Sequence, residues 1–193
     1  MLTELLRHIE EKAPLREADK QSIAGYFVRK RLRKRQFLLQ EGEVCRNLAF
    51  VAHGLLKSYT LDANGQEHIS LFAWEGWWVS DFKSFLFEEQ AILSIDALEP
   101  TEVLLIDRAN YERLLLEVPA MERYFRILYQ NSLVTKDRRL IVSNTYTARE
   151  KYLQLITTYP HIAQRVPQHL LASYLGLTPE TVSRIKRELR EEA

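Results

Sequence analysis

The chain has 193 residues, of which 46% are hydrophobic and 27% are charged, and its formal net charge is +1. This length suits one domain of ordinary size with a smaller second one, and the composition is that of a globular protein. No run approaches the ~18 apolar residues of a membrane span, and the first residues lack the order of a secretory signal, so we expect a cytoplasmic protein without a membrane partner. The single cysteine, Cys45, excludes an internal disulfide and a cysteine-ligated iron–sulfur cluster.

The first 28 residues are expected to form short amphipathic helices, because Leu2, Leu5 and Ile9 recur at helical spacing. From Arg31 to Asp107 the pattern changes to short β-type runs separated by turn signals. The expected strands are Phe37–Leu39, Leu48–Val51, Leu55–Leu61, His68–Trp74 and Thr101–Asp107. Several short strands at this spacing indicate a β-barrel or β-sandwich.

A basic run, Arg29–Arg35, precedes the first of these strands. A solvated approach to the strand would account for it without any function. An electrostatic partner, including DNA that flanks a binding site, is the functional interpretation.

From Arg108 onward the apolar period is helical, first in a short helix that ends near Pro119 and then in the long stretch Met121–Ser143. Residues spaced alternately by four and three form a stripe on the long helix: Tyr124, Leu128, Asn131, Thr135, Arg138 and Val142. This stripe predicts either a coiled-coil seam or a helix that lies on its own β-domain.

The segment Gln168–Arg187 has the spacing of a helix-turn-helix. Two helices that cross steeply need a small residue at the crossing, supplied by Ala172, and a residue suited to positive φ in the turn, supplied by Gly176. Thr178 is a good N-cap, and Pro179 suits the first turn of the second helix. The expected shared core comprises Leu171, Leu175, Leu177, Val182 and Ile185. An αα-hairpin that only packs would also fit this pattern.

In a DNA-binding version, the N-terminal part of the second helix enters the major groove. The exposed residues expected to contact DNA are Thr178, Glu180, Thr181, Ser183, Arg184 and Arg187. Glu180 can accept a hydrogen bond from cytosine N4, and Arg184 can donate to guanine O6 and N7 or to a phosphate. Nearby glutamates leave the basic footprint modest, so we expect the affinity for double-stranded DNA to depend on dimerisation.

A β-domain, a long helix and a helix-turn-helix, in this order, resemble the cyclic-AMP receptor protein and Fnr (Crp/Fnr) family of bacterial transcription regulators. The likeness covers nearly the whole chain and is sharpest in Ala172–Leu189. It implies an α+β fold with a cyclic-nucleotide-binding-like β jelly roll (a double-stranded β-helix) and N-terminal helices in residues 1–118. A long connecting and dimerisation helix would follow in 119–145, and a winged-helix-like helix-turn-helix domain in 146–193. We expect this last domain to be shortened, because the chain ends soon after its second helix.

The resemblance also implies a homodimer whose paired recognition helices contact a two-fold symmetric site. By this likeness Glu180, Ser183 and Arg184 fall on base-contacting positions. Pro179 stands where many relatives carry a base-contacting arginine, so the preferred DNA sequence is expected to differ from the best-known site of the family.

Members that bind cyclic nucleotides carry Gly-Glu for the ribose and then Arg-Ser or Arg-Thr for the phosphate. In this chain the arginine position falls on Ala91 and its partner on Ile92, and no arginine lies between Arg46 and Arg108. A buried phosphate needs a fixed cation, so we expect the jelly roll to be retained while cyclic-AMP recognition is lost. Lys83 or Ser84 could substitute for the missing cation.

An aromatic cluster lies in the same region and could line a pocket for another small-molecule effector, although core packing explains such clusters as well. The candidate pocket residues are Trp74, Trp77, Trp78, Phe82, Lys83 and Ser84. The histidines lack metal-ligand spacing, so neither a metal nor a cofactor is expected.

The sequence therefore predicts a dimeric, sequence-specific DNA-binding transcription regulator with a sensor domain that does not bind cyclic AMP. The alternative is a cyclic-nucleotide or other small-molecule binding module whose helical domain contacts protein rather than DNA. An enzyme is not expected, because no nucleophile motif, phosphate loop or carboxylate pair stands in a recognisable setting.

Overall fold

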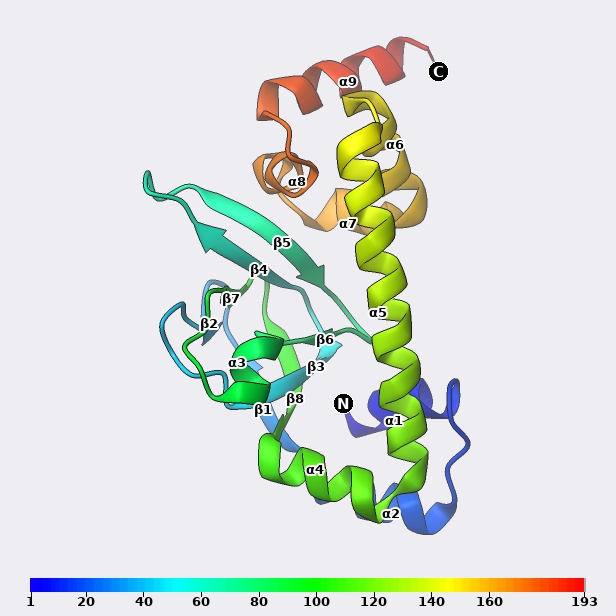
Figure 1. Ribbon diagram of the computed structural model, residues 1–193. Helices are drawn as coiled ribbons and strands as arrows, with labels where there is room; N and C mark the ends of the chain where they lie inside the picture. Colours follow the sequence, from blue (N-terminus) through cyan, green and yellow to red (C-terminus); the bar gives the residue numbers. More distant parts are fainter. Residues whose placement is uncertain (193) are drawn as a thin grey trace. The chain divides into compact units, whose positions relative to one another are not determined.

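The computed structural model describes residues 1–192 and divides into two compact units. The first unit comprises Met1–Thr60 and Ser70–Gln130, and the second comprises Leu61–Ile69 and the chain from Asn131 onward. Figure 1 follows the elements along the chain, from the N-terminal helices through the strands to the C-terminal helices. Within the described residues, no helix combines the length and the apolar character needed to span a membrane.

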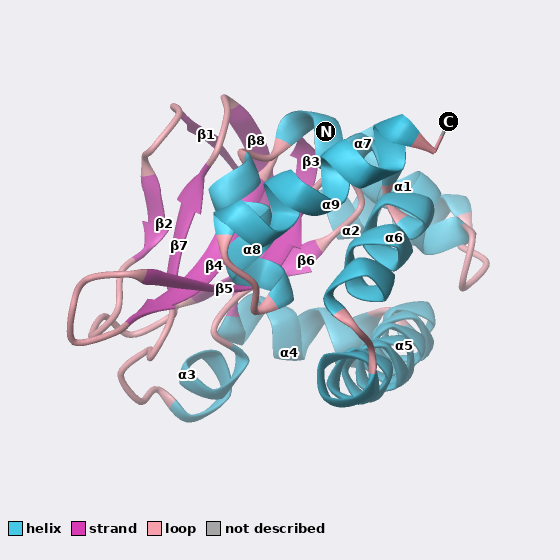
Figure 2. Cartoon of the chain, turned by 90° about the horizontal axis from the view of Figure 1, so that it is seen from above, coloured by secondary structure: helices cyan, strands magenta, loops and turns pink. Residues whose placement is uncertain are grey.

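Two four-stranded sheets form the β-domain of the first unit (Figure 2). The first sheet has the order β1 (Val28–Leu32), β8 (Thr101–Asp107), β3 (Asn47–His53) and β6 (Trp78–Val79). The second sheet has the order β2 (Phe37–Leu39), β7 (Ser94–Ala97), β4 (Leu56–Leu61) and β5 (Glu67–Ala73). The pairs β1–β8, β3–β8, β3–β6, β2–β7 and β4–β7 are antiparallel. The expected β jelly roll is confirmed.

The core of this domain lies where the inward faces of the strands meet. Phe50 of β3 and Leu104 and Ile106 of β8 are almost completely buried. The turn between β3 and β4 is held against the start of β8: Gly54 has φ +97°, and a Cβ at this position would lie 2.5 Å from Thr101 Oγ1. The same oxygen accepts a hydrogen bond from the amide of Leu55 at 3.1 Å. Only glycine fits this close approach.

Five helices begin in the first unit. They are α1 (Leu2–Glu10), α2 (Glu17–Ala24), α3 (Phe82–Phe87), α4 (Arg108–Glu117) and α5 (Pro119–Thr145), which continues into the second unit. The short helices expected at the N-terminus are present as α1 and α2, and Leu5 and Ile9 of α1 are fully buried. One uninterrupted helix, α5, occupies the stretch in which the long connecting helix was expected.

A hydrogen-bonded trio joins α1, β6 and α5. The indole Nε1 of Trp78 donates to the hydroxyl of Tyr124 at 2.8 Å, and this hydroxyl lies 2.7 Å from Nδ1 of His8. Burial lowers the pKa of His8 to about 4, so the ring is neutral near pH 7. Neutral His8 therefore accepts the hydroxyl hydrogen of Tyr124, and all three polar groups are satisfied.

Sequence periodicity missed three strands. β1 lies within the basic run, where exposed cations hide the alternation that buries Leu32. β7, Ser94-Ile95-Asp96-Ala97, is buried along its whole length although two of its residues are polar. β6 has only two residues, too few for any pattern.

The second unit contains four further helices: α6 (Ala148–Thr158), α7 (Pro160–Arg165), α8 (Gln168–Leu175) and α9 (Pro179–Glu191). Thr147 and Glu150 form a capping box at the start of α6. Tyr152 of α6 packs with Ala172, Val182 and Ile185 in a small apolar core. This core holds α6, α8 and α9 together.

Candidate functional site

The turn between α8 and α9 has the geometry that the sequence predicts. Gly176 follows α8 in the left-handed region at φ +67°. Its amide donates to the carbonyl of Ser173 at 3.1 Å, and the amide of Leu177 donates to the carbonyl of Ala172 at 2.9 Å. Both bonds satisfy carbonyls that would otherwise be left open at the end of α8. Ala172 is fully buried, as a close crossing of two helices requires.

The start of α9 is capped by its own side chains. Thr178 Oγ1 accepts from the amide of Thr181 at 3.2 Å, and Pro179 occupies the first helical position. Val182 and Ile185 are buried in the core of the second unit. The face of α9 that carries the predicted contact residues is therefore the one left outside this core.

The structure brings the predicted DNA-contacting residues together along that face. Glu180, Ser183, Arg184 and Arg187 are exposed, as is Thr178, whereas Thr181 is half-buried. Thr178 and Thr181 share a hydrogen bond between their hydroxyls at 3.1 Å, and two of the others also have side-chain partners. Arg184 pairs with Glu188 on the next turn at 2.8 Å, and Ser183 accepts a hydrogen bond from Gln168 of α8. An exposed pair of this kind contributes little energy, so Arg184 can exchange Glu188 for a base or a phosphate.

The orientation of α9 is fixed at its far end as well. Arg149 at the start of α6 donates through both terminal nitrogens of its guanidinium to the carboxylate of Glu192 after α9. This exposed pair joins the far end of α9 to α6, while Tyr152 packs against Val182 and Ile185. The apolar core is therefore the main contact that holds α9 on α6.

The positions that would hold a cyclic phosphate lack the required groups. Ala91 is 2% exposed and has no charge, and Ile92 is 68% exposed and apolar. The amide of Ile92 donates to Asp81 Oδ2 at 2.9 Å, and the other oxygen of Asp81 accepts from the amide of Ser84 at 3.1 Å. This carboxylate is buried beside the segment and would repel a second anion, so the local residues do not fit a cyclic nucleotide.

The residues expected to line an effector pocket lie at several separate places. Trp78 packs in an aromatic cluster with Phe50 and Phe125, while Trp74 and Trp77 contact each other with ring centroids 4.3 Å apart.

The other three expected residues lie on α3. Phe82 contacts the ring of Tyr129, and Lys83 forms an ion pair with Glu89. Ser84 is buried, accepting from the amide of Cys45 at 2.8 Å and donating to the carbonyl of Glu89. Ser84 thus has buried structural partners, whereas Lys83 has only an exposed one, so its substitution for the phosphate cation stays a prediction.

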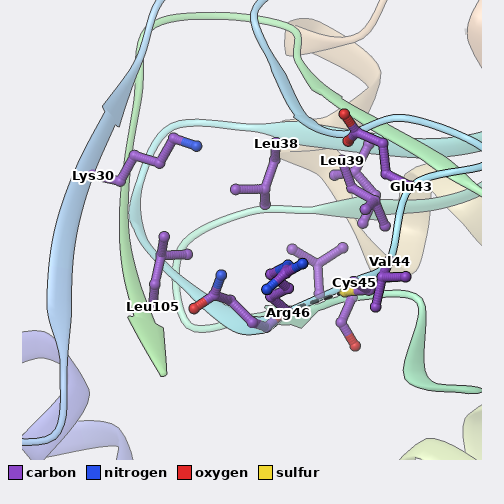
Figure 3. A pocket seen from close by; sticks show the side chains of 12 residues that line it. Lys30, Leu38, Leu39, Glu43, Val44, Cys45, Arg46 and Leu105 are labelled. Carbon is purple, nitrogen blue, oxygen red and sulfur yellow. Dashed lines mark hydrogen bonds between the residues drawn. The ribbon is translucent and has the colours of Figure 1, made fainter. Parts of the chain in front are cut away.

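A different pocket lies between the two sheets of the first unit (Figure 3). Its volume is about 380 Å³, and none of the six expected effector residues lines it. The lining comes from β1, β2, β3, β6, β7 and β8 and from the loop before β3: Lys30, Leu38, Leu39, Glu43, Val44, Cys45, Arg46, Asn47, Val79, Ser80, Ile95 and Leu105. The inward alternation of Lys30 with Leu32 was the signal that could have revealed this site.

The stripe that the sequence predicts on α5 is not the exposed apolar one. Tyr124 at its start is fully buried within the first unit, and Val142 near its end is half-buried. The apolar side chains that α5 leaves outside are each 59–66% exposed: Leu133, Val134, Leu140 and Ile141. They form two pairs seven residues apart, which is the repeat of a coiled-coil seam.

Residues 29–117 match the family model described as the cyclic nucleotide-binding domain. The chain is 30% identical over 165 residues to the probable transcriptional regulator flp of Lacticaseibacillus casei, covering 78% of this chain and 71% of that protein. It is 26% identical over 172 residues to the cyclic AMP receptor protein of Thermus thermophilus, covering 87% and 79%. Among solved structures, FixK2 from Bradyrhizobium japonicum has a TM-score of 0.71 and 21% identity, with 86% and 85% of the two chains covered.

Proposed function

The chain belongs to the Crp/Fnr family of transcriptional regulators, and from this membership we propose that it is a dimeric, sequence-specific DNA-binding protein acting in the bacterial cytoplasm. The observation that carries the proposal is the pair α8–α9. This pair has the stereochemistry of a helix-turn-helix: Gly176 is left-handed, Ala172 is buried and Thr178 caps the start of α9. One polar face of α9 stays exposed.

In this proposal α9 is the recognition helix. Glu180, Ser183 and Arg184 lie on its exposed face within its first two turns, which is where a helix-turn-helix protein contacts base edges. Arg184 has the donor geometry for guanine O6 and N7, and Glu180 can accept from cytosine N4. Thr178, Thr181 and Arg187 would contribute the neighbouring contacts, to phosphate or to base edges.

The dimer would form through α5. The exposed pairs Leu133–Leu140 and Val134–Ile141 form an apolar strip on α5. A second copy of the helix can cover this strip and remove it from water. Two recognition helices related by this dimer would face two half-sites about one helical turn apart on the DNA.

The sensor domain would not respond to cyclic AMP. The absence of a cation at Ala91 and the buried carboxylate of Asp81 support this part of the proposal. A phosphate transferred to such a place would lose its counter-charge and its hydrogen-bond donors. No enzymatic activity is part of the proposal.

The test is selection of bound duplexes from a random DNA library by the purified protein, with no nucleotide added. We expect enrichment of a two-fold symmetric site, and addition of cyclic AMP should leave both the site and its affinity unchanged. Absence of any enriched sequence, with and without cyclic AMP, would favour the alternative in which the helical domain contacts another protein. Enrichment only with cyclic AMP would contradict the role assigned to Ala91 and Asp81.

A further inference from the structure

The pocket between the sheets of the first unit has two chemically different parts. Its inner lining is apolar and comes from strands of both sheets: Leu38, Leu39, Val79, Ile95 and Leu105. Its outer lining is charged and comprises Lys30, Arg46 and Glu43. Figure 3 shows Lys30 extending into the space from β1, and Arg46 extending into it from the loop before β3. A cavity of about 380 Å³ is in the range of natural small-molecule sites.

Lys30 owes its position to the alternation of β1. It is paired with Val103 of β8 and lies on the same strand face as Leu32, which is 2% exposed. Its neighbour Arg31 lies on the opposite face and forms an ion pair with Glu102 at 2.8 Å. Arg31 on the outward face is therefore paired within the protein, whereas Lys30 on the inward face lines the pocket.

Within the described residues, neither Lys30 nor Arg46 has an ion pair or a side-chain hydrogen bond. Glu43, the one acidic residue of the lining, accepts from the amide of Gln40 at 3.0 Å. Two cations and one carboxylate leave the lining with a net charge of +1. A ligand carrying a single negative charge would balance it.

We propose that this pocket binds a small monocarboxylate with an apolar body. The carboxylate would lie between the ammonium of Lys30 and the guanidinium of Arg46, whose donors match its planar oxygens. The apolar body would lie against Leu38, Leu39 and Leu105. The site is separate from Ala91 and Ile92, where a cyclic phosphate would be held, since neither of those residues lines it.

The proposed ligand assigns an effector class to the sensor domain. It rests on the proposed function only in so far as the ligand would change DNA binding. Binding is therefore measured without DNA. If the carboxylate does not bind while library selection still enriches a site, the pocket assignment fails and the DNA-binding regulator stands.

The experiment is equilibrium dialysis of the full chain with octanoate, using octanamide as a neutral probe of the same length. We expect saturable binding of octanoate at one site per chain and at least 10-fold weaker binding of octanamide, because hydrogen bonds to a charged group differ by about this factor from neutral ones. Cyclic AMP at the same concentration should not displace octanoate.

Matched variants distinguish the effect of the two pocket cations on binding from the effect of the basic charge around β1. Lys30→Met with Arg46→Met keeps the apolar stems and should weaken octanoate binding at least 10-fold while leaving octanamide binding unchanged. Arg33→Gln removes an exposed cation that does not line the pocket and should leave both affinities unchanged.

Three results would overturn the proposal. They are no saturation of the wild-type chain by millimolar octanoate, equal affinity for octanoate and octanamide, and equal loss of octanoate binding in Arg33→Gln and in the double variant. The first would leave Lys30 as an inward charge that protects the edge strand β1 from pairing with another chain. The comparison of the two probes on the wild-type chain keeps the proposal testable even if the double variant fails to fold.

Discussion

The hydroxyl of Ser173 on α8 donates to the carbonyl oxygen of Glu67 on β5 at 2.6 Å. The same hydroxyl accepts from the amide of Ile69 at 3.0 Å. Arg139 of α5 adds hydrogen bonds to the carbonyls of Ile69 and Tyr174 and lies 4.0 Å above the ring of Tyr174. Since β5 is an edge strand of its sheet, one serine side chain satisfies backbone groups that a neighbouring strand would otherwise pair.

Replacing Ser173 with alanine should release this end of β5 from α8. The amide of Ile69 loses its acceptor, so we expect its hydrogen exchange to become at least 10-fold faster and the free energy of unfolding to fall by about 1–2 kcal/mol. Ser132→Ala, at an exposed position of α5, is the control and should change neither quantity. Unchanged exchange at Ile69 in Ser173→Ala would show that the hydrogen bond contributes nothing in solution.

Arg184→Ala should weaken specific DNA binding by about 1–3 kcal/mol and relax the preference at one base pair of each half-site. The measurement is a competition assay of the selected duplex against single-base variants. Glu188→Gln frees Arg184 from its ion pair and should not weaken binding. If Arg184→Ala weakens binding to all sequences equally, Arg184 contacts phosphate instead of a base.

Tyr124→Phe should destabilise the first unit by about 1–3 kcal/mol. The lost hydroxyl leaves the indole nitrogen of Trp78 without an acceptor and Nδ1 of His8 without a donor. The urea midpoint of unfolding measures the effect. The matched control is Tyr146→Phe, which removes a hydroxyl from an exposed side chain and should leave the midpoint in place.

The lowered pKa of His8 predicts how stability depends on pH. The unfolded chain takes up a proton near the ordinary value of 6.5, whereas the folded chain does so only at about 4. The contribution of neutral His8 is therefore complete above pH 6.5 and is lost as the pH falls toward 4. Because the ring is only half-buried, we expect a loss of about 1–2 kcal/mol over this interval.

The slope attributable to His8 can be isolated by comparing variants. His8→Gln keeps a hydrogen-bonding side chain without a proton that titrates, so its unfolding free energy should change less between pH 6.5 and pH 4. Parallel curves for His8→Gln and the wild type would rule out His8 as a source of the pH dependence.

Leu140→Asp should shift the protein from dimer to monomer, because it places a charge in the apolar strip of α5. Sedimentation velocity at micromolar concentration measures the distribution. Ser132→Asp adds the same charge to α5 outside this strip and should leave the dimer intact. A wild-type monomer under these conditions would remove the basis for two coupled half-sites.

The elements that could be predicted from the sequence are those whose own residues impose them. Gly176, Thr178 and Pro179 specify the turn and the start of α9 without help from the rest of the chain, and they lie where the sequence places them. The strands Leu48–Val51 and Leu55–Leu61, on either side of Gly54, were equally visible, because turn signals mark their ends.

The remaining features depend on tertiary contacts. The inward direction of Lys30 becomes evident only from the pairing of β1 with β8, because the exposed cations around Lys30 obscure its alternation with Leu32 in the sequence. Trp77 and Trp78 suggested a pocket, yet Trp78 packs in a cluster of rings that includes Phe125, from a distant part of the chain. The exposed strip of α5 was masked because Tyr124 and Leu128 have the same helical spacing but pack against the β-domain.

The hydrogen bonds of Asp81 constrain any redesign of this region for a nucleotide. Its two carboxylate oxygens accept hydrogen bonds from the amides of Ser84 and Ile92, so these two donors are not open to another anion. An arginine at Ala91 would restore only half of a nucleotide site, because the aspartate would remain its counter-ion. Removing Asp81 first would unpair two backbone amides. Introducing cyclic-nucleotide binding at this place would therefore require changes at Ala91 and Asp81 together.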